Sequence, residues 1–142
     1  SVGELVALEE KLGLDKPETF QAYARRIDAL KSELGGLLRK LKSQSKSIAG
    51  FGAPAKATTL MLHFGLGPDL VDFIVDDSPL KQGLYSPGQH VPVLASGAVY
   101  ERKPDYLLIL AWNFAPSIMA KHKAYAEAGG HFIVPLPKLE VF

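Results

Sequence analysis

The chain has 142 residues, 47% of them hydrophobic and 22% charged, values typical of a single soluble globular domain. The net charge of +1 argues against a dedicated nucleic-acid-binding protein, since affinity for the phosphate backbone requires a surplus of lysine and arginine. The absence of cysteine excludes disulfides, thiolate nucleophiles and cysteine-ligated metal sites within these residues.

The first ten residues, "SVGELVALEE", lack the basic stretch and apolar core of a signal peptide. They also lack an initiator methionine and begin in the middle of an apolar pattern, which suggests a fragment of a longer protein. No apolar run in the chain has the length of a membrane span. We therefore expect a cytoplasmic protein with no membrane partner.

A long amphipathic helix is predicted from Pro17, whose fixed backbone angle suits a first helical turn, to a basic tail near Lys46. Its apolar residues recur at spacings of three and four: Phe20, Tyr23, Ala24, Ile27, Leu30, Leu34, Leu37, Leu38 and Leu41. This stripe could be core, the seat of a partner helix, or part of an arm to a neighbouring domain, and core is favoured. Gly35-Gly36 is a weak point where a bend could occur.

Strands and helices alternate after Ser47. Strands are predicted over residues 48–52, 70–77, 90–93, 105–112 and 131–137, and helices over residues 55–64, 95–102 and 115–130. Several of the strands are apolar on both faces, which favours a parallel sheet covered on two sides. We therefore predict an α/β fold, a Rossmann-like three-layer domain with a mostly parallel sheet over residues 47–142, preceded by a helical arm over residues 1–46.

A glycine turn follows the first predicted strand. Gly50, Gly52 and Ala55 fit the pattern G-x-G-x-x-[G/A], in which the glycines allow a sharp turn and a close backbone approach and the last position lets helix and strand pack. Free amides at the helix start would then face an anion. Asp76 lies 26 residues beyond Gly50 (76 − 50), where a carboxylate commonly binds a ribose hydroxyl.

Two further residues modify this turn. Pro54 removes one N–H donor, and Lys56 adds a positive charge for a phosphate. The glycines could equally serve packing alone, and Asp76 and Asp77 could be turn formers before Ser78-Pro79. For Asp77 the turn role is favoured.

Other side chains are candidates for the same crevice. Trp112 and Asn113 end a predicted strand, although a purely structural tryptophan is nearly as well supported. Among the histidines, His90 in a loop rich in proline and glycine is the one expected near a ligand. His63 is expected to be packed, and surface or strand-edge roles are expected for His122 and His131.

No catalytic residue is predicted. The chain has no G-x-S-x-G elbow, no H-E-x-x-H, no P-loop and no clustered metal ligands, and nothing pairs a nucleophile with a base. A full dehydrogenase would need a substrate domain for which this chain has no room. The pattern indicates a binding module.

Four segments form a more specific pattern than the glycine fingerprint: "GFGAPAKATTL", "DFIVDDSPLKQGLYSPGQHVPV", "DYLLILAWNFAPSIM" and "AGGHFIVPLP", in that order. Together they resemble the C-terminal domain of the S-adenosylmethionine-dependent sugar C-methyltransferases. The resemblance covers nearly the whole chain. Two departures are Ala57, where the family usually has glycine after "GAPAK", and "GFG" where "GYG" is commoner.

The resemblance implies an enzyme acting on nucleotide-linked, typically dTDP-linked, deoxysugars, with S-adenosylmethionine and zinc bound in upstream domains. This chain would be the substrate-binding third domain, inactive when isolated, with the central methyltransferase domain as partner. The turn formed by Gly50, Phe51, Gly52, Ala53, Pro54, Ala55 and Lys56 would then cradle the diphosphate. The Lys81-Gln82-Gly83 and Pro87-Gly88-Gln89-His90 segments would approach the sugar or diphosphate, and Trp112-Asn113 would line the crevice.

Two other functions stay open from the residues. The glycine fingerprint alone would suggest an NAD(P)- or CoA-binding module. A structural domain with an empty turn, which dimerises through the arm, is the third interpretation.

Overall fold

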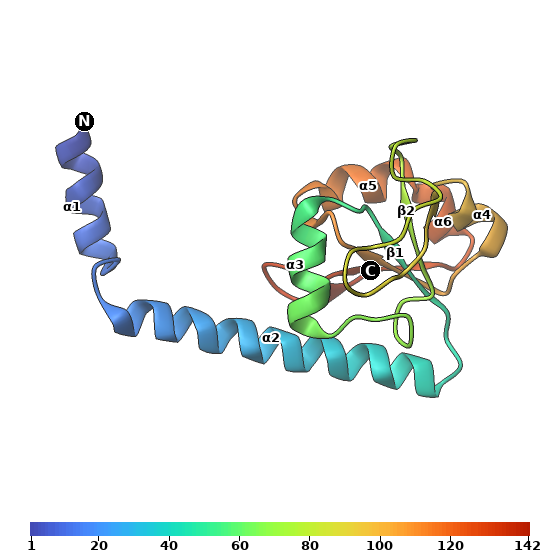
Figure 1. Cartoon of the computed structure of the whole chain (residues 1–142), viewed down its shortest axis with the longest axis horizontal. Helices are drawn as coiled ribbons and strands as arrows, with labels where there is room; N and C mark the ends of the chain where they lie inside the picture. Colours follow the sequence, from blue (N-terminus) through green and yellow to red (C-terminus); the bar gives the residue numbers. More distant parts are fainter.

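The computed structural model describes the whole chain, Ser1–Phe142, and begins with two helices. They are α1 (Val2–Leu12) and α2 (Pro17–Ser43). α1 starts at a capping box, in which the side chain of Ser1 accepts the amide N–H of Glu4. Figure 1 shows α1 standing away from the rest of the molecule and α2 running beneath the remaining elements.

The strands form one six-stranded sheet. They are β1 (Ile48–Phe51), β2 (Phe73–Asp76), β3 (Val93–Ala95), β4 (Tyr106–Ile109), β5 (His131–Val134) and β6 (Glu140–Val141). Their order is β3-β2-β1-β4-β5-β6, and all pairs are parallel except β5 with β6. The chain leaves β1 toward β2 on one side and returns to β4 on the other, so the topological switch point lies between β1 and β4.

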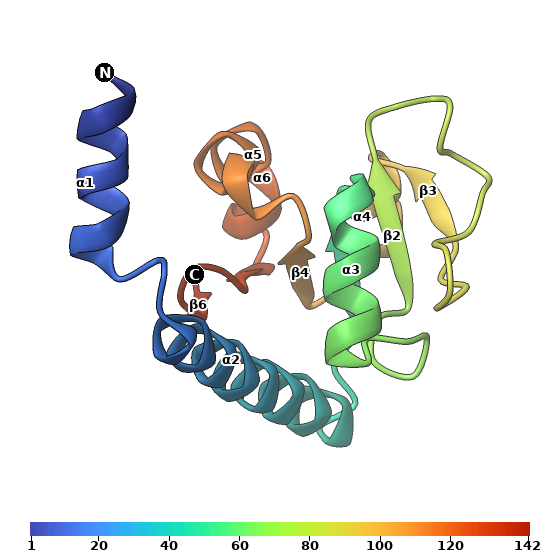
Figure 2. The same ribbon diagram turned by 60° about the vertical axis from the view of Figure 1, so that its left-hand side comes forward.

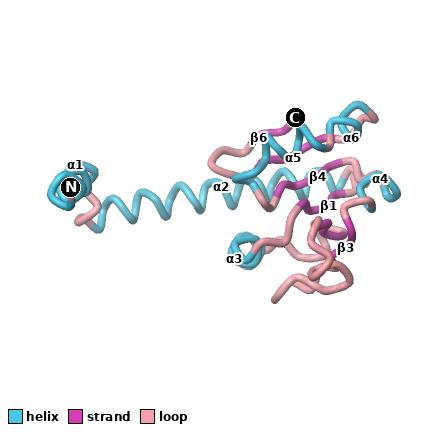
Figure 3. The backbone as a smooth tube through the Cα atoms, turned by 90° about the horizontal axis from the view of Figure 1, so that it is seen from above, coloured by secondary structure: helices cyan, strands magenta, loops and turns pink.

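Helices cover both faces of the sheet. After α2 come α3 (Ala55–Phe64), α4 (Ala98–Arg102), the 3₁₀ helix η1 (Trp112–Phe114), α5 (Ala115–Lys121) and α6 (Lys123–Glu127). α2 and α3 pack on one face and α4, α5 and α6 on the other. In Figure 2, β4 lies between α3 on one side and α5 and α6 on the other, and Figure 3 shows α3 and α6 on different sides of β1 and β4. The predicted α/β, Rossmann-like three-layer fold is confirmed.

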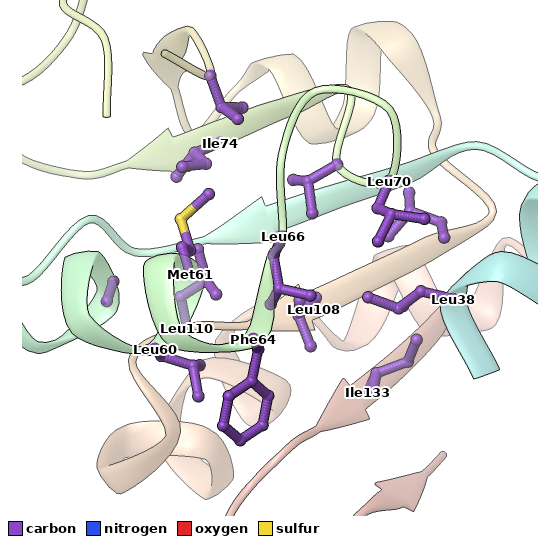
Figure 4. Packing of buried hydrophobic residues seen from close by; sticks show 14 of the residues in the cluster. Leu38, Leu60, Met61, Phe64, Leu66, Leu70, Ile74, Leu108, Leu110 and Ile133 are labelled. Atoms are coloured by element: carbon purple, nitrogen blue, oxygen red, sulfur yellow. The ribbon is translucent and has the colours of Figure 1, made fainter. Parts of the chain in front are cut away.

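Alternation along the strands divides the core into two clusters. In β2, Ile74 faces α2 and α3, whereas its neighbours Phe73 and Val75 face the opposite layer. Figure 4 shows the first cluster, with Leu38 of α2 close to Ile133 of β5. Both clusters consist of fully or nearly fully buried aliphatic and aromatic side chains, so both layers are bound to the sheet by apolar packing.

The two halves of α2 differ. Leu34, Leu38 and Leu41 are buried against the sheet, which confirms the core interpretation of the apolar stripe for this half. In the first half, Phe20 and Tyr23 are exposed. The helix continues through Gly35 and Gly36 without interruption. The domain boundary at residue 46 stays a prediction, but the packing places the second half of α2 in the three-layer core.

Two strand predictions need correction. β2 begins at Phe73, not at residue 70, because the amides of Leu70 and Val71 donate to the carbonyl of Gly67 and form a buried turn. The predicted edge strand is present but shifted: it lies at Val93–Ala95 and shares only Val93 with the predicted residues 90–93, since Pro92 has no N–H for the ladder.

The helix predicted over residues 115–130 is two helices. His122 takes a non-helical conformation between α5 and α6 and lies buried. The strand β6, which pairs antiparallel at the edge of the sheet, was not predicted. No helix is both long enough and apolar enough to cross a bilayer.

Candidate functional site

The two glycines of the fingerprint serve internal packing. Gly50 lies within β1, not in the turn, and a Cβ there would come within 2.8 Å of Cδ1 of Leu110. Gly52 has a positive φ of 89°, and its Cβ would lie 2.7 Å from Cβ of Ala111. The chain that follows β4 therefore closes tightly over the end of β1 at the switch point.

The expectation of free amides after β1 is wrong for two of them. The Gly52 N–H donates to the carbonyl of Val75 at 2.7 Å, and the Ala53 N–H donates to Oδ2 of Asp76 at 2.7 Å. Pro54 has no N–H, and the Ala57 amide donates to the Pro54 carbonyl.

Two amides at the start of α3, those of Ala55 and Lys56, donate to no group of the chain. These two N–H groups point along the helix axis at the positive end of the helix dipole. They are the main-chain donors that this turn leaves for an anion.

Asp76 holds the turn together. The residue is only 8% exposed, and its carboxylate accepts hydrogen bonds from the amides of Ala53 and Ser78, and from Nζ of Lys81 at 3.2 Å. Burial opposes ionisation, but these donors outweigh it and hold the pKa of Asp76 below its ordinary value. A carboxylate occupied in this way is a poor acceptor for a ribose, which weakens the dinucleotide interpretation. Asp77 instead pairs with Lys121 at 2.8 Å.

A cavity of about 250 Å³ lies between the start of α3 and the loop that follows β2. Among the predicted residues it brings together Ala53, Pro54, Ala55, Lys81 and Pro87. Sequence reasoning missed the others: Ala57, Thr58, Met61, Ile74, Leu84, Tyr85, Ser86 and Val93. Most of the lining is apolar, with polar groups at the turn and at Lys81, a composition typical of small-molecule sites.

Tyr85 and His90 form a stacked pair at this loop. Their ring centroids lie 4.4 Å apart with an interplanar angle of 7°, and Tyr85 is 54% exposed. His90, predicted to lie near a ligand, does not line the cavity itself but stacks on Tyr85, which does. A lone tyrosine in a loop rich in proline and glycine was the signal that could have found Tyr85.

Three of the predicted loop residues shape the loop. Gln82 donates from Nε2 to the carbonyl of Asp76 at 3.0 Å, and the Gly83 amide donates to the carbonyl of Val93. Gly88 has a positive φ, and a Cβ there would lie 2.6 Å from Cδ2 of Leu62 on α3. These contacts fix the loop against β3 and α3.

Trp112 and Lys56 lie elsewhere. Nζ of Lys56 stands 4.2 Å from the centroid of the Trp112 ring, a cation–π contact. Both line a second, mostly apolar groove of about 430 Å³ on the α2 side of α3. Asn113 is exposed in η1 and lines neither cavity. The structure thus divides the predicted site residues between two surfaces that share α3.

The remaining predicted positions are structural. Phe51 is buried, and its ring meets that of His122 edge-on at 4.8 Å, on the opposite face of the sheet. His122 is buried, contrary to the surface role expected, and burial lowers its pKa. Its Nδ1 lies 2.9 Å from the hydroxyl of Tyr100. His63, expected to be packed, is half-exposed.

The side chains form no group that suits a metal ion. No three histidine, aspartate or glutamate side chains converge, and the chain has no cysteine. A zinc site therefore does not fit the residues of this chain.

Comparison with known proteins agrees with this architecture. Residues 1–137 match the family model described as the C-methyltransferase C-terminal domain. The chain is 36% identical over 141 residues to C-methyltransferase NovU of Streptomyces niveus, and the match covers 99% of this chain but 34% of that protein. The chain thus spans about a third of the length of this relative. The resemblance noted in the motifs is confirmed, and the chain belongs to the C-methyltransferase C-terminal domain family.

Proposed function

We propose that this chain is the substrate-holding domain of a cytoplasmic S-adenosylmethionine-dependent C-methyltransferase that acts on a nucleotide-linked, dTDP-type deoxysugar. Support comes from the family match, from the 36% identity to a C-methyltransferase, and from the cavity beside the glycine turn. The methyl donor and any zinc would be bound by the part of the protein that precedes this domain. The chain itself would supply no catalytic group.

The cavity carries the proposal. Ala55, whose amide is unpaired, and Lys81 both line this cavity, and the unpaired amide of Lys56 follows in the same first turn of α3. Together they offer two N–H donors and one mobile cation, a set suited to a diphosphate. The Lys81 side chain is 42% exposed, so it can leave Asp76 and meet a phosphate oxygen.

The rest of the substrate would be held by the loop. The free face of the Tyr85 ring, opposite His90, offers a stacking surface for the nucleobase. The sugar would extend from the diphosphate toward Trp112 and Asn113 at the end of β4, with Gln82, Gly83 and Gly88 keeping the loop in place.

In the whole enzyme, a base would remove the proton next to the sugar keto group, and the enolate would attack the methyl group of S-adenosylmethionine. The present domain would raise the rate by orientation. Because the domain would hold the diphosphate, the reacting carbon of the sugar would stay in line with the methyl donor. The reaction between the two bound molecules would then be effectively intramolecular.

Titration calorimetry of the chain with dTDP, UDP and a dTDP-sugar tests this function. We expect binding that Lys81→Ala weakens roughly tenfold, since a hydrogen bond to a charged group is lost. Lys121→Ala is the matched control, because Lys121 pairs with the adjacent carboxylate of Asp77 but lies outside the cavity.

No heat with any of these nucleotides, or tight binding of NAD or CoA instead, would contradict the proposal. An equal loss of affinity in Lys81→Ala and Lys121→Ala would show that the nucleotide does not bind in this cavity. Methyl transfer catalysed by the 142-residue chain alone would overturn the assignment of chemistry to the preceding part.

A further inference from the structure

The first 23 residues expose an unusual share of the large apolar side chains of this chain. Eight of the sixteen that are exposed lie there: Val2, Leu5, Val6, Leu8, Leu12, Leu14, Phe20 and Tyr23. α1 has no buried residue at all. A helix with an apolar face open to water is stable only when another surface covers that face.

The exposed apolar surface continues from α2 into the groove beside α3. Tyr23 and Ile27 of α2 form one wall of this groove, and Leu60 and Phe64 of α3 form the other. The groove ends at Trp112, after β4. We define the docking face as the apolar sides of α1 and of the first half of α2, together with this groove.

The second half of α2 shows what the same stripe does when it is covered. Leu34 and Leu38 are nearly inaccessible to solvent because they pack against the sheet. Figure 1 shows that the first half of the helix extends beyond the sheet, and that α1 lies farther out still. Leu136 lines the groove, but no element of this chain buries α1 or the side chains of Phe20 and Tyr23, so their cover must come from outside these residues.

We propose that the docking face is covered by the part of the same protein that precedes Ser1. The chain spans 34% of its relative and matches a domain described as C-terminal, which leaves about two thirds of that length to precede it. That part is joined covalently to the start of α1. A tethered partner acts at an effective concentration in the millimolar range, which favours it over a free second copy of the chain.

This inference rests on the proposed function, in which the preceding part transfers the methyl group. Because the docking face ends at Trp112 and Lys56, a body seated on it would lie beside the crevice at the carboxyl ends of β1 and β4. Docking on α1 and α2 would then set the distance between the methyl donor and the sugar held by this domain. The arm is a positioning element for the reaction.

The test uses the full-length protein with a specific protease site inserted immediately before Ser1. After cleavage, gel filtration shows whether the two pieces stay together. We expect association that Leu5→Ser and Tyr23→Ser each weaken roughly tenfold or more, as truncation of buried apolar anchors does. Arg25→Ser is the matched control: it introduces the same residue on the opposite side of the same helix, and we expect no change. Circular dichroism checks that each variant keeps its helices.

Three results would overturn the inference. The two cleaved pieces of the wild type could fail to stay together in gel filtration, or the pieces could associate as tightly in Leu5→Ser and Tyr23→Ser as in Arg25→Ser. Light scattering on the uncleaved protein could also show a dimer that Leu5→Ser turns into a monomer, which would make a second copy the occupant. Calorimetry with a dTDP-sugar on the same samples distinguishes this failure from failure of the proposed function, since the cavity beside Lys81 is separate from the docking face.

Discussion

The two halves of α2 carry the same apolar spacing and lie in opposite surroundings. Leu38 is fully buried under the sheet, whereas Tyr23, about four helical turns earlier, is 56% exposed. Both belong to one uninterrupted helix. The difference shows that apolar periodicity identifies the side of a helix that packs against another surface. It does not identify whether that surface belongs to the same domain or to another part of the protein.

The largest effect should come from the buried half. Leu38→Ala removes a side chain that packs between β5 and the other core leucines, and we expect a loss of about 2–5 kcal/mol in the free energy of unfolding. Urea denaturation followed by circular dichroism measures it. A loss below about 1 kcal/mol would mean that α2 is not part of the cooperative core.

Glycines sharpen the same contrast between covered and open positions. Gly52→Ala places a methyl group 2.7 Å from Cβ of Ala111 at a left-handed φ, and we expect a loss of about 1–3 kcal/mol. A methyl group added at Gly36 of α2 would meet no atom within 4 Å, so Gly36→Ala should stabilise by about 0.5–1 kcal/mol. Thermal unfolding shows whether each variant has a lower or a higher melting temperature than the wild type. A change in the same direction for both variants would contradict this account.

Much of the fold could be predicted because its signals are local. The helix over residues 55–64 is found with the predicted bounds, and β1, β4 and β5 lie within predicted strands, since short apolar runs and proline and glycine positions report nearby backbone geometry. β6 has two exposed residues and no apolar alternation, so no pattern marked it.

The candidate site depends on contacts between distant residues, and its details could not be predicted. Asp76 bonds to Ala53, 23 positions away, and this bond removes an amide that the local pattern would leave free. Likewise, Lys56 turns toward Trp112, away from the cavity that Lys81 lines. Such pairings follow from the register of β1 with β2 and β4, which a single sequence does not display.

A smaller effect is expected where the buried half of α2 joins the sheet. The carboxylate of Asp105 accepts hydrogen bonds from the amide and hydroxyl of Ser47, each at 2.8 Å, and from Nζ of Lys46 at 3.0 Å. These donors, the Ser47 amide first, lower the pKa of Asp105 to about 2. Because the pKa of Asp105 is lower in the folded than in the unfolded chain, its ionised form stabilises the fold at pH values above the unfolded pKa of 3.8. This stabilisation is lost as the pH falls toward 2.

Because the Asp105 side chain is 36% exposed, solvent screening limits its contribution to about 1 kcal/mol. Asp105→Asn should therefore lower stability slightly at about pH 7 and flatten the decline between about pH 4 and pH 2. Urea denaturation at several pH values measures both. An unchanged acid decline in the variant would show that other carboxylates cause it.

The smallest effect should come from the open half of α2. Phe20→Ser removes an aromatic ring that is 55% exposed, and we expect the free energy of unfolding of the 142-residue chain to change by less than about 0.5 kcal/mol. Urea denaturation beside Leu38→Ala makes the comparison within one helix. If Phe20→Ser instead costs as much as Leu38→Ala, the first half of α2 is already covered in the isolated chain, and the preceding part of the protein is not needed to explain its apolar face.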